Sequence, residues 1–284
     1  MRGISIVGLA FAGVLATAPM ALAADWDGFV DVGGSWSKVD FSVTGVPFPS
    51  GFDITTWSGD FRASVSRDFN ARWGFQVDVL ASDRVVRESL GGLSEQNDNP
   101  TGDVALHLYK RPGNWLFGAL LQYGGDLDDS YPLTHLFAGV EAQARWGKLT
   151  LYGQLAYYHV GDSFDSSDGW ASSLQARYFA TPGCLLQAQA TYSVLSDLGN
   201  LTTWTFAAGG EHQFGSSPFS AYARYEHQEI GFSGMGVSET FRSDGVVAGF
   251  RWAFGAQNKS LEERNNGGTT LDPLGGNFLL GGSL

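Results

Sequence analysis

Charged side chains stand at alternate positions inside segments whose other positions are apolar. Asp60 and Arg62, for example, alternate with Gly59 and Phe61. Carboxylate and guanidinium groups placed in this way can bind ions of opposite charge or pair with each other across strands. The same parity selects these candidates along the chain: Asp60, Arg62, Asp78, His107, Glu141, Arg145, Arg177, Glu211, Arg224, Glu226 and Arg251. We expect all of them to point to one side of a sheet.

The arginines of this set favour an anionic ligand, because guanidinium binds carboxylate and phosphate groups well. They are Arg62, Arg145, Arg177, Arg224 and Arg251. Acidic members of the set share the same face and can cancel the positive field. Two interpretations therefore stay open: the charges line a water-filled space and select ions, or they pair across strands and fill the interior.

The histidines raise the alternative of catalysis. A hydrolase needs a nucleophile beside a base that a third polar group orients. His107 has the parity of the charged face, but no serine motif accompanies it. His159 lies near Asp162 and Ser163, a coincidence that a serine-rich chain is expected to produce. Hydrolysis is therefore a secondary hypothesis.

Acidic residues also gather in two segments between the periodic stretches. One holds Asp126, Asp128 and Asp129 with His135 nearby, and the other holds Asp162, Asp165 and Asp168. Paired acids with a histidine are what an aspartyl-type protease would need. The second group lacks the spacing of a calcium-binding EF-hand loop. We expect solvated loop charge rather than cations that bridge to anionic lipid, and we expect no metal and no cofactor.

The elements that position these residues are predicted to be long β-strands, because period-two alternation is typical of a strand with two different faces. Twelve segments show it: 28–40, 55–69, 72–83, 102–111, 114–124, 134–146, 148–160, 170–179, 184–195, 201–214, 219–229 and 241–254. Most exceed the usual length of about 5–6 residues in soluble strands. They match the roughly 9–11 residues of a tilted membrane-spanning strand.

The connectors alternate between short and long. The short ones are 70–71, 112–113, 147, 180–183 and 215–218, and the longer ones are 41–54, 84–101, 125–133, 161–169, 196–200 and 230–240. Outer-membrane barrels have short periplasmic turns and longer outer loops. The pattern predicts twelve strands with both ends periplasmic, although ten or fourteen strands remain possible. We expect the longest loop, 84–101, to be mobile and able to fold into the barrel.

Aromatic residues mark both ends of the apolar face. Trp73, Trp115, Trp146, Tyr178, Phe214, Phe219 and Phe254 adjoin the short turns, and Trp57, Tyr123, Tyr157, Trp170, Tyr192, Trp204 and Tyr225 adjoin the long loops. Two aromatic girdles around an aliphatic band are what the two interfaces of a membrane favour.

Composition limits the class of protein further. The chain has 16% charged residues, 14% aromatics and 39 glycines, with a mean hydropathy of −0.08. This mixture fits neither a disordered chain nor a helical membrane protein. A formal net charge of −12 argues against nucleic acid as a partner. The single cysteine, Cys184, excludes an internal disulfide.

The N-terminus predicts export by a cleaved signal peptide at residues 1–23. Arg2 precedes an apolar stretch over 4–20, and Ala21 and Ala23 frame an A-x-A cleavage site. An uncleaved anchor helix is the alternative.

The last periodic segment resembles the closing strand of bacterial outer-membrane β-barrel proteins, which are porin-like in architecture. Val246, Ala248, Phe250, Trp252 and Phe254 share its apolar face, and the segment ends in an aromatic residue. The resemblance implies that the barrel-assembly machinery recognises this segment. In that family the signal usually ends the chain, whereas here 30 residues follow Phe254.

Those residues, 255–284, change character, since they lack alternation and are rich in glycine and asparagine. We expect a flexible periplasmic tail. The alternative is a plug in the barrel mouth, which the apolar end at 278–280 keeps open.

The sequence thus predicts a single closed antiparallel transmembrane β-barrel over 24–254, located in the bacterial outer membrane. Its expected function is a narrow channel for small polar or anionic solutes. The alternatives are an outer-membrane enzyme, either a lipid-modifying hydrolase or a protease, and a structural, non-conducting barrel. The expected partners are outer-membrane lipid and lipopolysaccharide, the assembly machinery and small solutes, with the oligomeric state undetermined.

Overall fold

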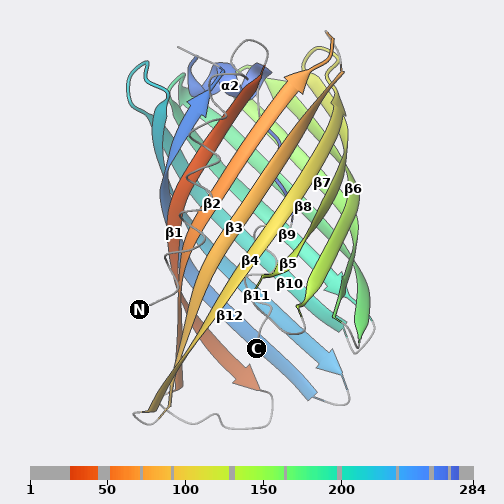
Figure 1. Cartoon of the computed structure of the whole chain (residues 1–284), viewed down its shortest axis with the longest axis vertical. Helices are drawn as coiled ribbons and strands as arrows, with labels where there is room; N and C mark the ends of the chain where they lie inside the picture. The colour runs from red at the N-terminus through yellow and green to blue at the C-terminus, as the bar shows by residue number, and fades with distance from the viewer. Residues whose placement is uncertain are drawn as a thin grey trace.

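The computed structural model describes residues 26–43, 52–70, 73–90, 93–127, 132–162, 165–196, 200–234, 237–255, 259–267 and 270–274. The predicted signal peptide lies outside these residues. The described chain forms a closed barrel of twelve antiparallel strands in sequence order (Figure 1). The strands are β1 (Asp27–Val43), β2 (Phe52–Asp68), β3 (Trp73–Leu90), β4 (Leu93–Lys110), β5 (Trp115–Asp126), β6 (Thr134–Trp146), β7 (Leu149–Gly161), β8 (Ser166–Thr181), β9 (Cys184–Leu195), β10 (Asn200–Gln213), β11 (Phe219–Gly234) and β12 (Val237–Phe254).

The barrel closes where the first strand meets the last. β1 pairs with β12 in an antiparallel register that sets Gly28 opposite Phe254 and Asp31 opposite Arg251. Each described strand therefore has two hydrogen-bonded neighbours. Hydrocarbon supplies no hydrogen bonds, so a closed sheet is one of the few folds that satisfies its backbone inside a membrane. The predicted fold class, strand number and closing strand are confirmed.

The two faces of the strands differ as the alternation predicts. Along β2, Trp57 is 57% exposed on the outside, whereas Ser64 and Ser66 are buried on the inside. Twelve of the fourteen predicted girdle residues, and Phe250, are exposed large side chains. The other two, Phe254 and Tyr192, are half-buried. An apolar outer face with aromatic residues at both ends of the strands is suited to contact with lipid. Within the described residues, no helix is long and apolar enough to cross a membrane.

The short turns use glycine where the backbone requires it. Gly113, Gly147 and Gly215 adopt φ angles of 63°, 57° and 62°. This left-handed region costs little for glycine and more for other residues. A side chain at these positions would meet open space, so backbone conformation rather than crowding favours glycine there.

The predicted loops 84–101 and 230–240 are wrong over most of their length. β3 continues to Leu90 and β4 begins at Leu93, with Arg87 opposite Gln96. Likewise, β11 continues to Gly234 and β12 begins at Val237. The side chains of residues 95–98 are all exposed, so these strand ends project into water as a wall extension. Where both faces meet water, the contrast between faces disappears, and periodicity fails to reveal the strand.

The C-terminal segment turns back into the barrel after β12. A short helix, α2 (Leu261–Gly267), lies at the end that carries the short turns (Figure 1). Its leading residue, Leu261, is buried against Phe179 and Leu185 of the barrel wall. Residues 270–274 continue into the interior, where Leu271 and Leu274 are buried.

Candidate functional site

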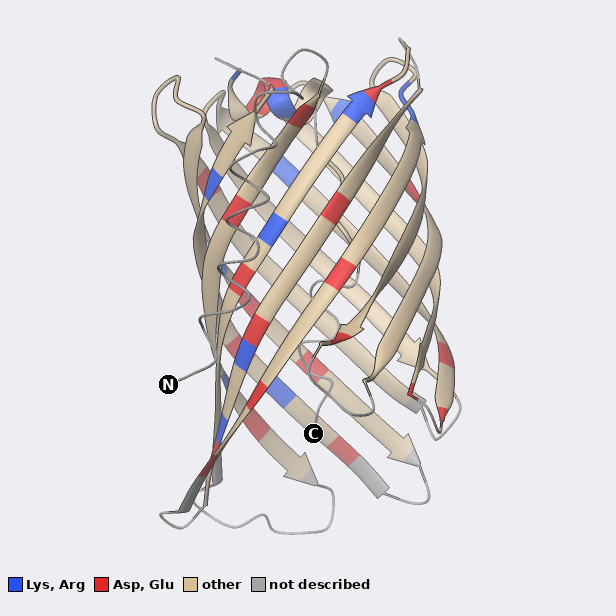
Figure 2. Cartoon of the chain, in the orientation of Figure 1, with Lys and Arg blue, Asp and Glu red and all other residues tan. Residues whose placement is uncertain are grey.

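The candidate site is the barrel interior together with the C-terminal segment, here residues 259–267 and 270–274. Charged residues lie along the middle of the strands as well as at their ends (Figure 2). Those on the inner face are largely buried, including Asp78, His107, Glu141 and Arg177. The interior is therefore polar, while the outer face is apolar.

The segment enters the interior at the mouth that carries the short turns. Lys259 Nζ lies 3.6 Å from Asp27 Oδ2 at the start of β1. The backbone N–H of Leu261 donates to Gln213 Oε1 at 3.1 Å. The N–H of Glu262 donates to the carbonyl of Pro182 at 3.1 Å. These contacts fix α2 across the mouth.

A capping box starts α2. The backbone N–H of Ser260 donates to Glu263 Oε2 at 2.7 Å, and the N–H of Glu263 donates back to Ser260 Oγ at 3.3 Å. Reciprocal bonds of this kind satisfy N–H groups that the first helical turn leaves free. The donated bonds from Ser260 lower the pKa of Glu263. The spacing Ser260-x-x-Glu263 is the signal by which the sequence could have revealed this helix.

Beyond α2, an acidic residue is held at the centre of the lumen. Arg62 Nη1 donates to Asp272 Oδ1 at 2.7 Å, and Arg177 Nη2 donates to Asp272 Oδ2 at 2.6 Å. Burial raises the pKa of Asp272, but the charges of Arg177 and Arg62 outweigh it and hold the pKa well below its ordinary value. The carboxylate therefore stays ionised.

Wall residues also hold the backbone around Asp272. The carbonyl of Leu271 accepts hydrogen bonds from Arg62 Nη2 at 2.9 Å and from Gln76 Nε2 at 2.6 Å. The carbonyl of Asp272 accepts a bond from Gln154 Nε2 at 2.7 Å. Every one of these contacts joins the segment to a different strand of the barrel, so the segment has a defined position.

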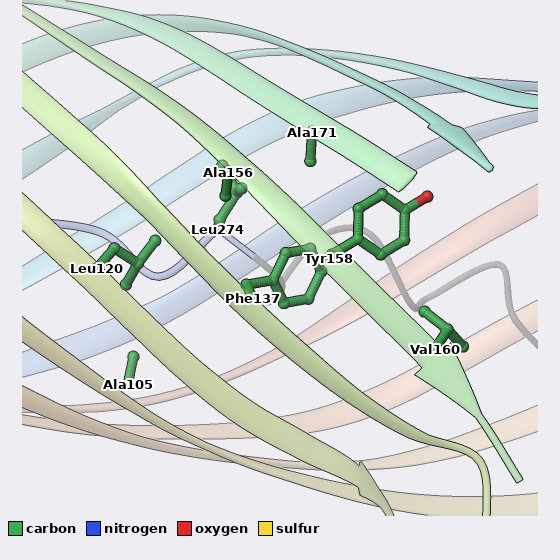
Figure 3. Packing of buried hydrophobic residues seen from close by; sticks show 8 residues of the cluster. All are labelled: Ala105, Leu120, Phe137, Ala156, Tyr158, Val160, Ala171 and Leu274. Atoms are coloured by element: carbon green, nitrogen blue, oxygen red, sulfur yellow. The ribbon is translucent and has the colours of Figure 1, made fainter. Parts of the chain in front are cut away.

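Two apolar contacts anchor the same stretch. Leu271 packs in a buried cluster with Tyr109, Leu116 and Tyr152. Leu274 joins a second cluster that includes Leu120, Phe137 and Ala156, and Figure 3 shows its side chain beside that of Ala156. Burying a leucine side chain is worth roughly 1.5–3 kcal/mol. Polar and apolar contacts thus act together on five consecutive residues.

The structure brings five of the predicted charged residues into one network. Arg62 Nη2 lies 2.8 Å from Asp78 Oδ1. The ring of His107 lies between Asp78 Oδ2 at 3.4 Å and Glu141 Oε2 at 3.0 Å. Arg177 joins through Asp272. These residues pair with each other rather than lining open space singly.

The remaining candidates lie apart from this network. Arg251 bridges Glu211 at 2.9 Å and Asp31 at 2.6 Å, and so joins β12 to β10 and β1. Arg224 pairs with Glu226 on the same strand at 2.5 Å.

Asp60 accepts a bond from Ser82 Oγ at 2.7 Å. Arg145 donates to backbone carbonyls at the mouth, those of Gly113 and Asn266.

Several members of the site were not predicted from the sequence. Asp31 alternates with the apolar residues Val30 and Val32, and the alternation could have placed it on the inner face. Asp272 lies in a segment without periodicity, so no pattern pointed to it. Asp103, paired with His135 Nε2 at 2.5 Å, lies at the start of a predicted strand and was also missed.

A cavity of about 270 Å³ remains beside the segment. Its lining runs from Asp27 and Lys259 near one mouth to Asp126 and His135 near the other. Seven acidic and seven basic residues contribute to the lining. The lining charges balance, so the arginines do not produce an unopposed positive field.

The residues considered for catalysis do not form a catalytic arrangement among the described parts of the chain. His107 contacts two carboxylates, Asp78 and Glu141, and His159 pairs with exposed Asp168. Ser163 and the pair at 128–129 lie outside the described residues. The described residues contain no group of three or more His, Cys, Asp or Glu side chains that could hold a metal ion.

Comparison with known proteins supports the fold. No family model and no curated protein matches the sequence. An outer-membrane channel from Pseudomonas putida F1 superposes with a TM-score of 0.57 and 13% identity, covering 84% of this chain and 98% of the other. The translocator domain of the autotransporter NalP from Neisseria meningitidis gives a TM-score of 0.48 and 11% identity, covering 85% of this chain and 96% of the other. A FadL homologue from Pseudomonas aeruginosa gives 0.45 and 10%, covering 83% and 92%. The superposition on the Pseudomonas putida channel, together with the closed twelve-stranded barrel, shows that the chain has the fold of the bacterial outer-membrane β-barrel proteins.

Proposed function

We propose that this protein is a narrow outer-membrane channel for small polar solutes, and that residues 259–267 and 270–274 restrict its lumen. The observation that carries the proposal is the cavity of about 270 Å³ beside the docked segment. Its lining combines apolar side chains with seven acidic and seven basic residues, and these charged groups favour water and hydrogen-bonding solutes.

The width of the passage follows from the way the interior is filled. Barrels of about eight strands are filled by side chains, and those of sixteen or more hold a wide aqueous channel. Twelve strands leave intermediate space, and here residues 270–274 occupy part of it, in contact with β2, β3, β6, β7 and β8. The remaining cavity is lined by Asp31, Arg224 and Arg251 and, nearer the other mouth, by Asp126 and His135. Such a passage would admit small solutes only.

The charge balance of the lining supports a polar channel without strong ion selection. Arg62, Arg177 and Arg251 each contact a carboxylate at 2.9 Å or less. Paired charges of this kind attract a passing anion less than free ones, because the opposing charges cancel at a distance.

Solute flux into liposomes tests the proposal. The full-length protein is reconstituted, and swelling is followed with glycine, glucose and a trisaccharide as the external solute. We expect glycine to enter, glucose to enter more slowly and the trisaccharide to be excluded. A variant with Asp272→Ala and Leu274→Ser should widen the size limit, and Glu95→Ala, on the exposed β3–β4 extension, serves as the control. Equal impermeability of folded protein and folded variant to all three solutes would contradict the proposal.

A further inference from the structure

The two arginines that hold Asp272 face each other across the barrel. Arg62 belongs to β2 and Arg177 to β8, which are six strands apart in either direction around the ring of twelve. A single carboxylate contacts both, at 2.7 Å and 2.6 Å. The carboxylate of Asp272 therefore bridges two arginines from opposite walls, and another small anionic group at the same place could bridge them too.

The wall side chains around Asp272 donate hydrogen bonds to its carboxylate and to the backbone carbonyl oxygens beside it. Arg177 Nη1 donates to the carbonyl of Thr270 at 2.6 Å. Gln76 and Gln154 donate to the carbonyls of Leu271 and Asp272. Guanidinium groups bind carboxylates through strong charge-assisted hydrogen bonds. The barrel wall thus presents a set of donors that the chain's own acidic segment satisfies.

Removal of the Asp272 carboxylate would leave a net positive site. Arg62 keeps a carboxylate partner, because Asp78 lies 2.8 Å from it. Arg177 has Gln175 as its neighbour on β8, and Asp272 is its acidic partner among the described residues. A buried guanidinium without a partner anion costs free energy, so we expect another anion to take the place of the Asp272 carboxylate.

The site can be reached from the cavity. Arg62, Arg177 and Asp272 all line it, and the side chain of Asp272 is 29% exposed toward it. Arg264 of α2 lines the same cavity nearer the mouth, and its guanidinium nitrogens have no hydrogen-bond partner within the described part of the chain. An anion that entered at this mouth would pass a second positive group on its way to the first.

We propose that Arg62 and Arg177 form a carboxylate-binding site at the centre of the lumen, which Asp272 fills in the resting protein and which small solutes bearing a carboxylate occupy by displacing it. The proposal deepens the channel function, on which it rests for the passage of such solutes. It identifies carboxylates as the solute class and Asp272 as the internal competitor.

Direct binding to the full-length chain tests the site apart from transport. Purified Asp272→Ala protein is titrated with acetate and with succinate by calorimetry, and acetamide is the neutral probe. The variant removes the competitor but keeps the anchors Leu271 and Leu274. We expect both carboxylates to bind it at least about tenfold more tightly than they bind the unaltered protein, because they meet two guanidinium groups there. Acetamide should bind to neither protein.

Two further variants link binding to the named residues. Asp272→Ala combined with Arg177→Gln should lose the added affinity. Asp272→Ala combined with Arg242→Gln should keep it, because Arg242 lies on β12 in an exposed ion pair with Glu229 of β11. Retention of the heat-dependent mobility of a folded barrel in electrophoresis checks that each protein is folded. Folded Asp272→Ala protein that binds acetate no better than the unaltered protein overturns the proposal.

The outcomes for the site and for the channel are separable. Carboxylate binding without solute flux would leave the site standing and contradict the channel. Flux of glucose without carboxylate binding would support the channel and overturn the site. To test displacement itself, succinate is added to the unaltered chain and tryptic cleavage after Arg264 is followed. We expect succinate, but not succinamide, to raise the cleavage rate several-fold, and an unchanged rate would contradict displacement.

Discussion

Asp272 and Arg177 lie 2.6 Å apart inside the barrel, although 95 positions separate them in the sequence. This contact ties the C-terminal segment to β8 in the wall of the barrel. Arg62 completes it from the opposite wall. The segment therefore has a defined docked position, and several measurable properties depend on it.

Loss of the Asp272 charge should release the segment more often. Asp272→Asn keeps the size of the side chain but removes its negative charge and replaces one acceptor oxygen with an NH2 group, so at least one hydrogen bond to a charged group, worth about 1.5–3 kcal/mol, is lost. We expect a cysteine at Leu274, in a Cys184→Ser background, to react with a maleimide at least about tenfold faster when Asp272 is also replaced. Leu274 is 3% exposed when docked, so its reaction reports release. Equal rates in the two proteins would show that the ion pairs do not hold the segment.

The apolar anchor should matter as much as the ion pairs. Leu271 is 1% exposed, and truncation of a buried leucine to alanine costs about 2–5 kcal/mol. Leu271→Ala should therefore increase tryptic cleavage after Arg264 by at least about tenfold. Leu127→Ala is the matched control, because Leu127 is 60% exposed. Cleavage of both variants at the rate of the unaltered protein would contradict the docked position.

Docking should depend on pH only in acid. The pKa of Asp272 is lower in the docked segment than in a released one, because Arg177 and Arg62 outweigh the effect of burial. The stabilisation from ionised Asp272 is therefore complete above the ordinary pKa of about 4 and is lost as the pH falls through the lower, docked value. We expect labelling of the cysteine at Leu274 to be flat from pH 5 to 8, after correction for maleimide chemistry, and to rise in stronger acid. With Asp272→Asn this rise should shrink, and a rise centred near neutral pH would point to a different group.

Sequence periodicity predicted the barrel because a membrane imposes opposite demands on the two faces of every spanning strand. Trp57 and Phe250 had to face outward, and Asp60 and Arg62 inward, for the strands to lie in lipid at all. No such demand acts on a strand end such as residues 95–98, whose side chains are exposed on both faces, and the prediction failed there.

The lumen was predictable only as a set of inward positions. Parity placed Arg62, Asp78 and His107 on one face, but pairing depends on register and on how strands curve around the ring. Asp272 has no periodic context, and its contacts with β2 and β8 are set by three-dimensional closure of the barrel. The capping box at Ser260 was the one local signal that the tail contains ordered structure.

Arg251 should contribute to the stability of the barrel itself. It links Asp31 on β1 with Glu211 on β10 across the closing strand, at 2.6 Å and 2.9 Å. Arg251→Ala would leave two largely buried carboxylates without this cation, and breaking such a pair costs roughly 3–5 kcal/mol. Urea unfolding in lipid vesicles, followed by tryptophan fluorescence, measures the change. Arg242→Ala is the control, since an exposed pair contributes about 0–1 kcal/mol; equal stability of the two variants would contradict this role.

The conductance of single molecules in a planar bilayer tests the central claim most directly. The full-length protein is compared with the variant that carries Asp272→Ala and Leu274→Ser, both checked for folding. We predict small, stable steps for the unaltered protein and steps at least about twofold larger for the variant, because release of the segment widens a lumen of fixed strand number. Identical steps in the two proteins, or no steps from either, would contradict the account of a channel that its own C-terminal segment restricts.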